Sequence, residues 1–210
     1  MIKEVVQDVL DNNFEPIVDE ICEYFGEKYE RELKERAENV SISLVKDNGV
    51  FATKNSQVYV GDEPVCIKED GVSHLIIPLS MVCDANGNVA FVHVLIHALT
   101  DEPFIKDNKD AFNEIVVDYM ANEIAKKLQE QGINITMCNN PCYESKSFYS
   151  HLFKEIEEFY TDNEEKIISS RMGEHVEFEN IDEYIDGAQE VVDKAFVEEI
   201  SKEDFVIKRR

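Results

Sequence analysis

The sequence predicts an α+β protein, in which a small antiparallel sheet lies between helical regions along the chain. Between residues 40 and 77, short runs of alternating apolar residues are separated by turn-forming residues, a pattern typical of antiparallel strands. Before and after this region, apolar residues recur at the spacing of amphipathic helices. We therefore expect a helical N-terminal arm over 1–38, a core over 39–145 and a helical C-terminal region over 146–210 that packs with the core as one unit.

The N-terminal arm has helical periodicity throughout. Pro16, preceded by Asn12 and Asn13, is expected to split it into two helices. The second helix carries a stripe of apolar residues at helical spacing. This stripe consists of Ile17, Val18, Ile21, Cys22, Phe25, Tyr29 and Leu33.

Five short strands follow the arm. They are expected over residues 40–45, 50–53, 57–60, 64–68 and 74–77. Turn-forming residues separate the strands at three points. These turns are Asp47-Asn48-Gly49, Gly61-Asp62 and Glu69-Asp70-Gly71.

The segment from Val89 to Leu99 is apolar on every side except at His93 and His97. A helix with this composition is buried all round, and the spacing of four places both imidazoles on one face. A buried imidazole without a partner costs about 1–3 kcal/mol. A metal ion is the common partner that satisfies both rings, and tetrahedral zinc binds neutral imidazole readily. Asn86 or Asn88 is expected to cap the start of this helix.

A second long helix is expected over residues 110–131, after a polar loop, and Gly132 ends it. Glu114 and Asp118 fall at one end of a face that also carries two alanines, which allow another backbone to approach closely. Two histidines and a glutamate form a known three-ligand zinc set. Asp118 is placed to accept a hydrogen bond from the far nitrogen of a ligand histidine. Further helices are expected over 147–160, 163–171 and 181–200.

These two segments, His93-Val-Leu-Ile-His97 and Asn113-Glu114-Ile-Val-Val-Asp118, resemble the gluzincin branch of the zinc metallopeptidases. The resemblance covers about residues 40–131 and implies a zincin-like fold. It implies zinc ligands at His93, His97 and Glu114, with Asp118 behind one histidine. The chain also resembles compact bacterial proteases of the antirepressor-cleaving type. That second alignment makes Asp118 the third ligand, but the match at Glu114 needs no substitution and is preferred.

The chain departs from the family at one position. The motif of the family is His-Glu-x-x-His, and its glutamate moves the proton from the metal-bound water to the leaving amine. Val94 occupies that position here and cannot accept a proton. The expected function is therefore that of a zinc-binding pseudo-peptidase that binds a peptide or protein partner. One alternative is a weakly active hydrolase that uses Asp101 or Glu102 as its base.

Other interpretations of the same residues stay open. His93 and His97 could bond Glu114 and Asp118 directly, forming a polar cluster without an ion. The chain would then be an acidic interaction protein, with a basic partner for its charged helices. Cys138 and Cys142 have no second pair at zinc-finger spacing, so a loop thiol pair is expected rather than a metal site. The resemblance also implies a later residue that stabilises the reaction intermediate, for which Tyr143, Tyr149 and His151 are candidates.

The composition limits the partners and the compartment. The chain has 45 acidic and 21 basic residues and a formal net charge of −24, which repels the phosphates of nucleic acids and of anionic membranes. No signal peptide and no membrane-spanning stretch is recognisable. Five scattered cysteines are typical of reduced thiols. We therefore expect a cytoplasmic protein.

Overall fold

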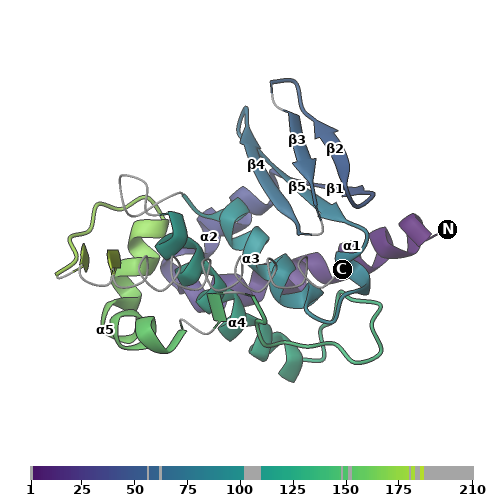
Figure 1. Cartoon of the computed structure of the whole chain (residues 1–210). Coiled ribbons are helices and arrows are strands. Elements are labelled where there is room, and N and C mark those ends of the chain that lie inside the picture. Colours follow the sequence, from purple (N-terminus) through teal and green to yellow (C-terminus); the bar gives the residue numbers. More distant parts are fainter. Residues whose placement is uncertain are drawn as a thin grey trace, which may run out of the picture.

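The computed structural model describes residues 2–55, 57–61, 63–101, 110–147, 149–150, 153–179, 181–182 and 185–186. These residues form a mixed α+β structure, which confirms the predicted class (Figure 1). The helices are α1 (Ile2–Phe25), α2 (Glu27–Ala37), η1 (Met81–Cys83), α3 (Gly87–Leu99), α4 (Asp110–Glu130) and α5 (Phe153–Arg171). The strands are β1 (Val40–Val45), β2 (Gly49–Ala52), β3 (Gln57–Val60), β4 (Val65–Glu69) and β5 (Val72–Pro78). No helix in the described ranges is long and apolar enough to cross a membrane.

The N-terminal arm breaks at a different residue from the predicted one. Helix α1 runs through Pro16, and the chain changes direction at Gly26, between α1 and α2. Proline removes one backbone donor and leaves the rest of the helix intact when packing supports it. Here Ile17 and Ile21 are buried directly after it. Gly26 has a φ of 93°, which an L side chain rarely adopts and which cannot continue a helix.

The five strands lie at the predicted positions, but the prediction of an antiparallel sheet is wrong for β1. The order in the main sheet is β1-β5-β4, with β1 parallel to β5 and β4 antiparallel to β5. Strands β2 and β3 form a separate antiparallel pair. The three segments between β1 and β5 make a connection long enough for a parallel pairing, which a tight hairpin cannot supply.

The turn from β4 to β5 matches the sequence pattern. Asp70 and Gly71 both have positive φ, at 52° and 80°, as a two-residue hairpin of the primed type requires. Asp and Gly are residues that adopt this conformation at low cost. This turn holds β4 at the edge of the main sheet, and α3 packs against β4 and β5.

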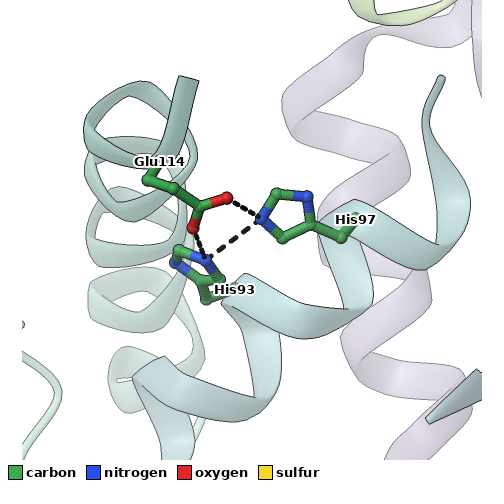
Figure 2. Close-up of side chains that lie close together, drawn as sticks. All are labelled: His93, His97 and Glu114. Atoms are coloured by element: carbon green, nitrogen blue, oxygen red, sulfur yellow. Dashed lines mark hydrogen bonds and ion pairs between the residues drawn. The ribbon is translucent and has the colours of Figure 1, made fainter. Parts of the chain in front are cut away.

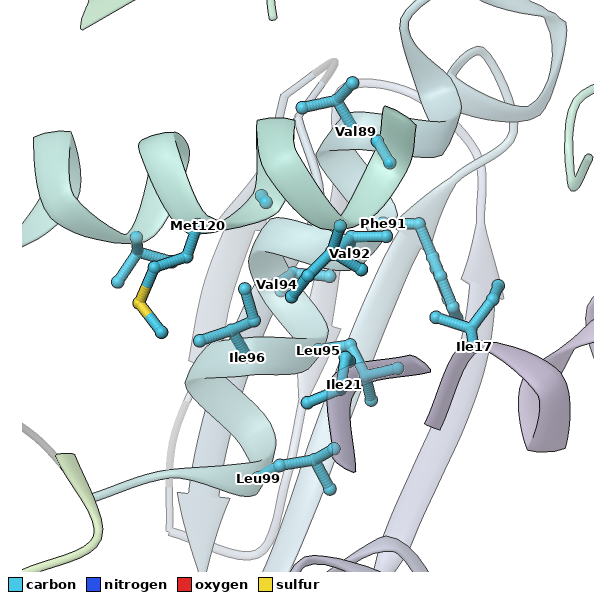
Figure 3. Packing of buried hydrophobic residues seen from close by; sticks show 14 of the residues in the cluster. Ile17, Ile21, Val89, Phe91, Val92, Val94, Leu95, Ile96, Leu99 and Met120 are labelled. Carbon is cyan, nitrogen blue, oxygen red and sulfur yellow. The ribbon is translucent and has the colours of Figure 1, made fainter. Parts of the chain in front are cut away.

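Helix α3 lies in the centre of the hydrophobic core, as its composition predicts. Its apolar side chains belong to one core cluster with residues of α1 and α4 (Figure 3), and the helix packs directly against α4. Phe91, Leu95 and Leu99 are fully buried. The N-cap position is Asn86, but its side chain makes no capping hydrogen bond. Asn86 is therefore the N-cap, as one of the two predicted residues, while the buried Asn88 side chain bonds the segment after α4, accepting from Ile135 N at 2.9 Å.

The helices after the core differ from the prediction in extent. Helix α4 ends as predicted, and Gly132 follows with a φ of 73°. The two helices expected over 147–160 and 163–171 are one helix, α5, because its buried face continues from Ile156 to Ile168. Most of the helix expected over 181–200 lies outside the described residues, as does most of the loop that precedes α4.

Candidate metal centre

Two histidines of α3 and a glutamate of α4 point toward one another (Figure 2). His93 Nε2 lies 3.1 Å from His97 Nε2 and 3.0 Å from Glu114 Oε2. The other carboxylate oxygen, Glu114 Oε1, lies 3.4 Å from His97 Nε2. The spacing of four residues on α3 places the rings side by side, and the packing of α4 on α3 brings the carboxylate to them.

The two imidazole nitrogens are spaced like ligands of a small tetrahedral cation. Zinc binds imidazole nitrogen and carboxylate oxygen at about 2.0–2.2 Å, so neighbouring ligand atoms in a tetrahedral site are about 3.3 Å apart. The two imidazole nitrogens are 3.1 Å apart, close to this value, and each has one carboxylate oxygen of Glu114 nearby, Oε2 at 3.0 Å from His93 and Oε1 at 3.4 Å from His97. Among the residues that the structure describes, this triad is the one group of histidine, cysteine and acidic side chains that could hold a metal ion.

Asp118 lies on the opposite side of the His93 ring from the triad. Its Oδ1 is 3.5 Å from His93 Nδ1, while His93 Nε2 points to Glu114. The arrangement is that of a carboxylate that orients a ligand histidine, in which the far ring nitrogen donates to the acid. The geometry therefore favours Glu114, rather than Asp118, as the third donor of the triad.

Two serines that the sequence analysis did not identify complete the surroundings of Asp118. Ser145 Oγ and Ser147 Oγ both donate to Asp118 Oδ2, at 2.7 and 2.5 Å. The segment that carries them is also tied to α4 through Ser145 N, which donates to Asn122 Oδ1 at 2.7 Å. The one sequence signal is the spacing of Asp118 and Asn122, which places both side chains on one face of α4.

Contacts within the cluster change the pKa of His93 and of Glu114. Burial lowers the pKa of His93, but the hydrogen bonds of Asp118 and Glu114 outweigh this effect and raise it to about 9. Burial raises the pKa of Glu114, but the hydrogen bonds and charges of His93 and His97 hold it well below its usual range. Without a metal ion the cluster is therefore held together by a charged imidazole and a carboxylate, whereas a metal ligand must be a neutral imidazole.

The triad lies in the wall of a cavity of about 650 Å³. The walls are formed by β4 and the residues before it, by α3 and the segment that precedes it, by α4, and by residues 145–147 and Tyr149. Val94, the residue that follows His93, lies in the same wall. The cavity has the size of a small-molecule or peptide side-chain site.

The structure places the other predicted residues as follows. Asp101 forms an ion pair with Arg36 at 2.9 Å and is not part of the cavity wall, so its predicted role as a base is not supported by its position. Tyr143 donates to the backbone of Ile133 at 2.9 Å. Tyr149 does line the cavity. Glu102 and His151 lie outside the described residues.

The cysteines are free thiols, and the pair in the loop after α4 bonds only to nearby backbone. Cys138 Sγ lies 3.6 Å from the oxygen of Asn140, and Cys142 Sγ lies 3.3 Å from that of Glu144. Neither cysteine belongs to the metal-ligand group found among the described residues. The expectation of a plain loop thiol pair is consistent with these contacts.

In comparisons with known proteins, no family model, no curated protein and no solved structure matches the chain.

Proposed function

We propose that the protein is a zincin-like pseudo-peptidase that binds a divalent metal ion, zinc in the first place, at His93, His97 and Glu114. In this proposal its cavity holds a segment of a peptide or protein partner without cleaving it. The observation that carries the proposal is the convergence of two imidazole nitrogens and the Glu114 carboxylate in the cavity wall that also contains Val94. A bound metal ion would supply a Lewis acid, which polarises a carbonyl oxygen.

The chain's own residues have separate roles in this function. His93, His97 and Glu114 hold the ion, and Asp118 orients His93. Val94 leaves the cavity without a base beside the ion, and the loss of such a base typically costs about 10²–10⁴-fold in rate. Binding without turnover follows from this combination.

The edge of the main sheet supports an extended peptide as the partner. Strand β4 is an edge strand, and Val65 and Cys66 of this strand line the cavity. An extended segment can add to an exposed strand edge through main-chain hydrogen bonds, while neighbouring pockets take alternate side chains. The net charge of −24 would speed the approach of a basic partner rather than decide its affinity.

The metal is tested by measuring the zinc content of protein purified without added metal, for the wild type and His97→Ala. About one equivalent in the wild type and none in the variant is the expected result. A metal-free wild type that also does not take up added zinc would overturn the metal part of the proposal. It would favour the alternative cluster, in which His93 bonds Glu114 directly at 3.0 Å.

Peptide binding is tested separately with an array of unstructured peptides. Ala90 of α3 lines the cavity, so Ala90→Trp should fill the space and abolish binding. Ala52→Trp is the matched control, because Ala52 is exposed at the end of β2 and does not line the cavity. Equal binding by both variants would exclude the cavity as the peptide site.

A further inference from the structure

Asp118 is a buried carboxylate with an unusually complete set of donors. It is 4 % exposed, and it interacts with three groups from two different parts of the chain. Oδ1 faces His93 Nδ1 at 3.5 Å, and Oδ2 accepts from two serine hydroxyls at 2.7 and 2.5 Å. A buried charge is tolerated when hydrogen bonds to its lone pairs replace water.

The serines are held in place by a small network of their own. Ser147 N lies 3.3 Å from Ser145 Oγ, and the two hydroxyl oxygens are 3.1 Å apart. Ser147 Oγ also accepts from Tyr149 N at 3.1 Å. Because Ser145 N donates to Asn122 and both serine hydroxyls donate to Asp118, the segment 145–147 is fixed to α4 at two side chains one turn apart. The hydroxyls therefore have a defined direction toward Oδ2.

We propose that Ser145 and Ser147 are positioning residues of the metal centre. Through Asp118 they hold the His93 imidazole in the tautomer and orientation that aim Nε2 at His97 and Glu114. The predicted effect on metal affinity rests on the proposed function. The effect on the orientation of His93 does not, because it can be measured without a metal ion.

The physical reason is the alternative left to Asp118 when the serines are removed. Its Oδ2 would then be a buried charged oxygen without a donor, which is unfavourable because nothing replaces the hydration that it has lost. The carboxylate avoids this unfavourable state if it takes up a proton or rotates away. Either change weakens its hold on the Nδ1 proton of His93, so the lone pair is no longer held on Nε2. Loss of such outer partners of a metal ligand typically lowers metal affinity about 10–100-fold.

The test is the zinc affinity of the double variant Ser145→Ala/Ser147→Ala, measured by competition with a chelating dye. We expect a loss of about 10–100-fold. Ser150→Ala is the matched control, because Ser150 Oγ donates to the backbone of Ser147 at 2.9 Å in the same segment. It should bind zinc like the wild type. Ser145→Thr/Ser147→Thr keeps both hydroxyls and should restore most of the affinity.

A second measurement separates positioning from a merely structural role. Nitrogen NMR shifts of the His93 ring report its tautomer. They are measured in metal-free Glu114→Ala protein, where Glu114 no longer competes for a proton on Nε2, at a pH where the ring is neutral. We expect the Nδ1-protonated form when both serines are present and a mixture when both are replaced by alanine. Should the double variant not fold, the single alanine variants give the same comparison.

The outcomes are distinguishable from those of the proposed function. A wild type that binds no zinc overturns the proposed function, while the tautomer comparison still decides the role of the serines. Unchanged affinity and an unchanged tautomer in the double alanine variant overturn this inference. An equal loss of affinity in Ser150→Ala also overturns it, because the effect would then belong to the segment rather than to the hydroxyls.

Discussion

His93 of α3 is held between two carboxylates of α4, with Nδ1 3.5 Å from Asp118 Oδ1 and Nε2 3.0 Å from Glu114 Oε2. The two acids are four residues apart and therefore lie on one face of their helix. The imidazole ring of His93 therefore contacts both acids, and the positions of these two side chains on α4 set its orientation. This relationship points Nε2 of His93 toward Glu114 and toward the second histidine, His97.

Removal of metal is expected to destabilise the protein. A ligand that binds only the folded state stabilises it by about 2.7 kcal/mol at a free concentration one hundred times its dissociation constant. Dialysis against a chelator should therefore lower the thermal midpoint of the wild type, and added zinc should restore it. Differential scanning calorimetry measures this shift. The variant His93→Ala/His97→Ala should show no response to chelator, and a wild type that also does not respond would contradict a bound structural ion.

Val94→Glu is expected to create a hydrolytic activity. It places a carboxylate beside His93 in the cavity wall, where a general base contributes about 10²–10⁴-fold to the rate. Hydrolysis of a quenched fluorescent peptide library in the presence of zinc measures the gain. Val94→Gln is the control, because it has the same size but cannot accept the proton. Equal rates for both variants would show that the cavity does not place a substrate next to the ion.

The metal-free protein is expected to lose stability as the pH rises toward 9. The pKa of His93 is raised from about 6.5 in the unfolded chain to about 9 in the folded protein. A raised pKa stabilises the fold fully below the unfolded value, and the contribution disappears as the pH passes through the folded value. Urea unfolding of chelator-treated protein between about pH 6 and about pH 9 measures this loss. The free energy of unfolding of His93→Gln should change less with pH over the same interval. An equal change in the wild type and the variant would show that other groups cause the pH dependence.

Arg171 is expected to be a major contributor to stability. It is 1 % exposed, and its Nε and Nη2 donate to Thr100 Oγ1 at 3.2 and 2.9 Å, at the end of α3. Hydrogen bonds that involve a charged group are worth about 1.5–3 kcal/mol, so Arg171→Met should lower the free energy of unfolding by about that amount. Urea unfolding at neutral pH measures it.

The matched control for Arg171→Met is Arg31→Met. The Arg31 side chain is 91 % exposed, and its ion pair with Glu35 spans 3.7 Å. Such exposed pairs contribute about 0–1 kcal/mol. A similar loss in both arginine variants would mean that burial of Arg171 adds nothing to the stability.

Much of the local structure could be predicted, because it depends on interactions between residues close in the chain. The turn at Asp70 and Gly71 requires positive φ values, which those residues adopt readily. The end of α4 before Gly132 follows from the same property. The common face of His93 and His97 follows from the pitch of a helix.

The elements that depend on distant partners could not be predicted. Alternating apolar residues in β1 indicate a strand but not its neighbour, so its parallel pairing with β5 came from the tertiary structure. Pro16 stays inside α1 because burial of the residues after it compensates for one missing hydrogen bond. Local preference alone is a weak guide in such cases, since packing overrides it.

In the candidate site, too, local features could be predicted from the sequence, whereas contacts between distant residues could not. By itself, the sequence determined the donor types, their spacing on two helices and the absence of a base at Val94, because these are properties of one segment at a time. Only the tertiary structure decided that Glu114 faces both rings, that Asp118 lies behind one of them, and that Ser145 and Ser147 complete it. The two serine hydroxyls are 27 and 29 residues from Asp118 in the sequence. They reach it only because the chain between them folds back, and the periodicity of a helix or strand does not predict such a contact between distant residues.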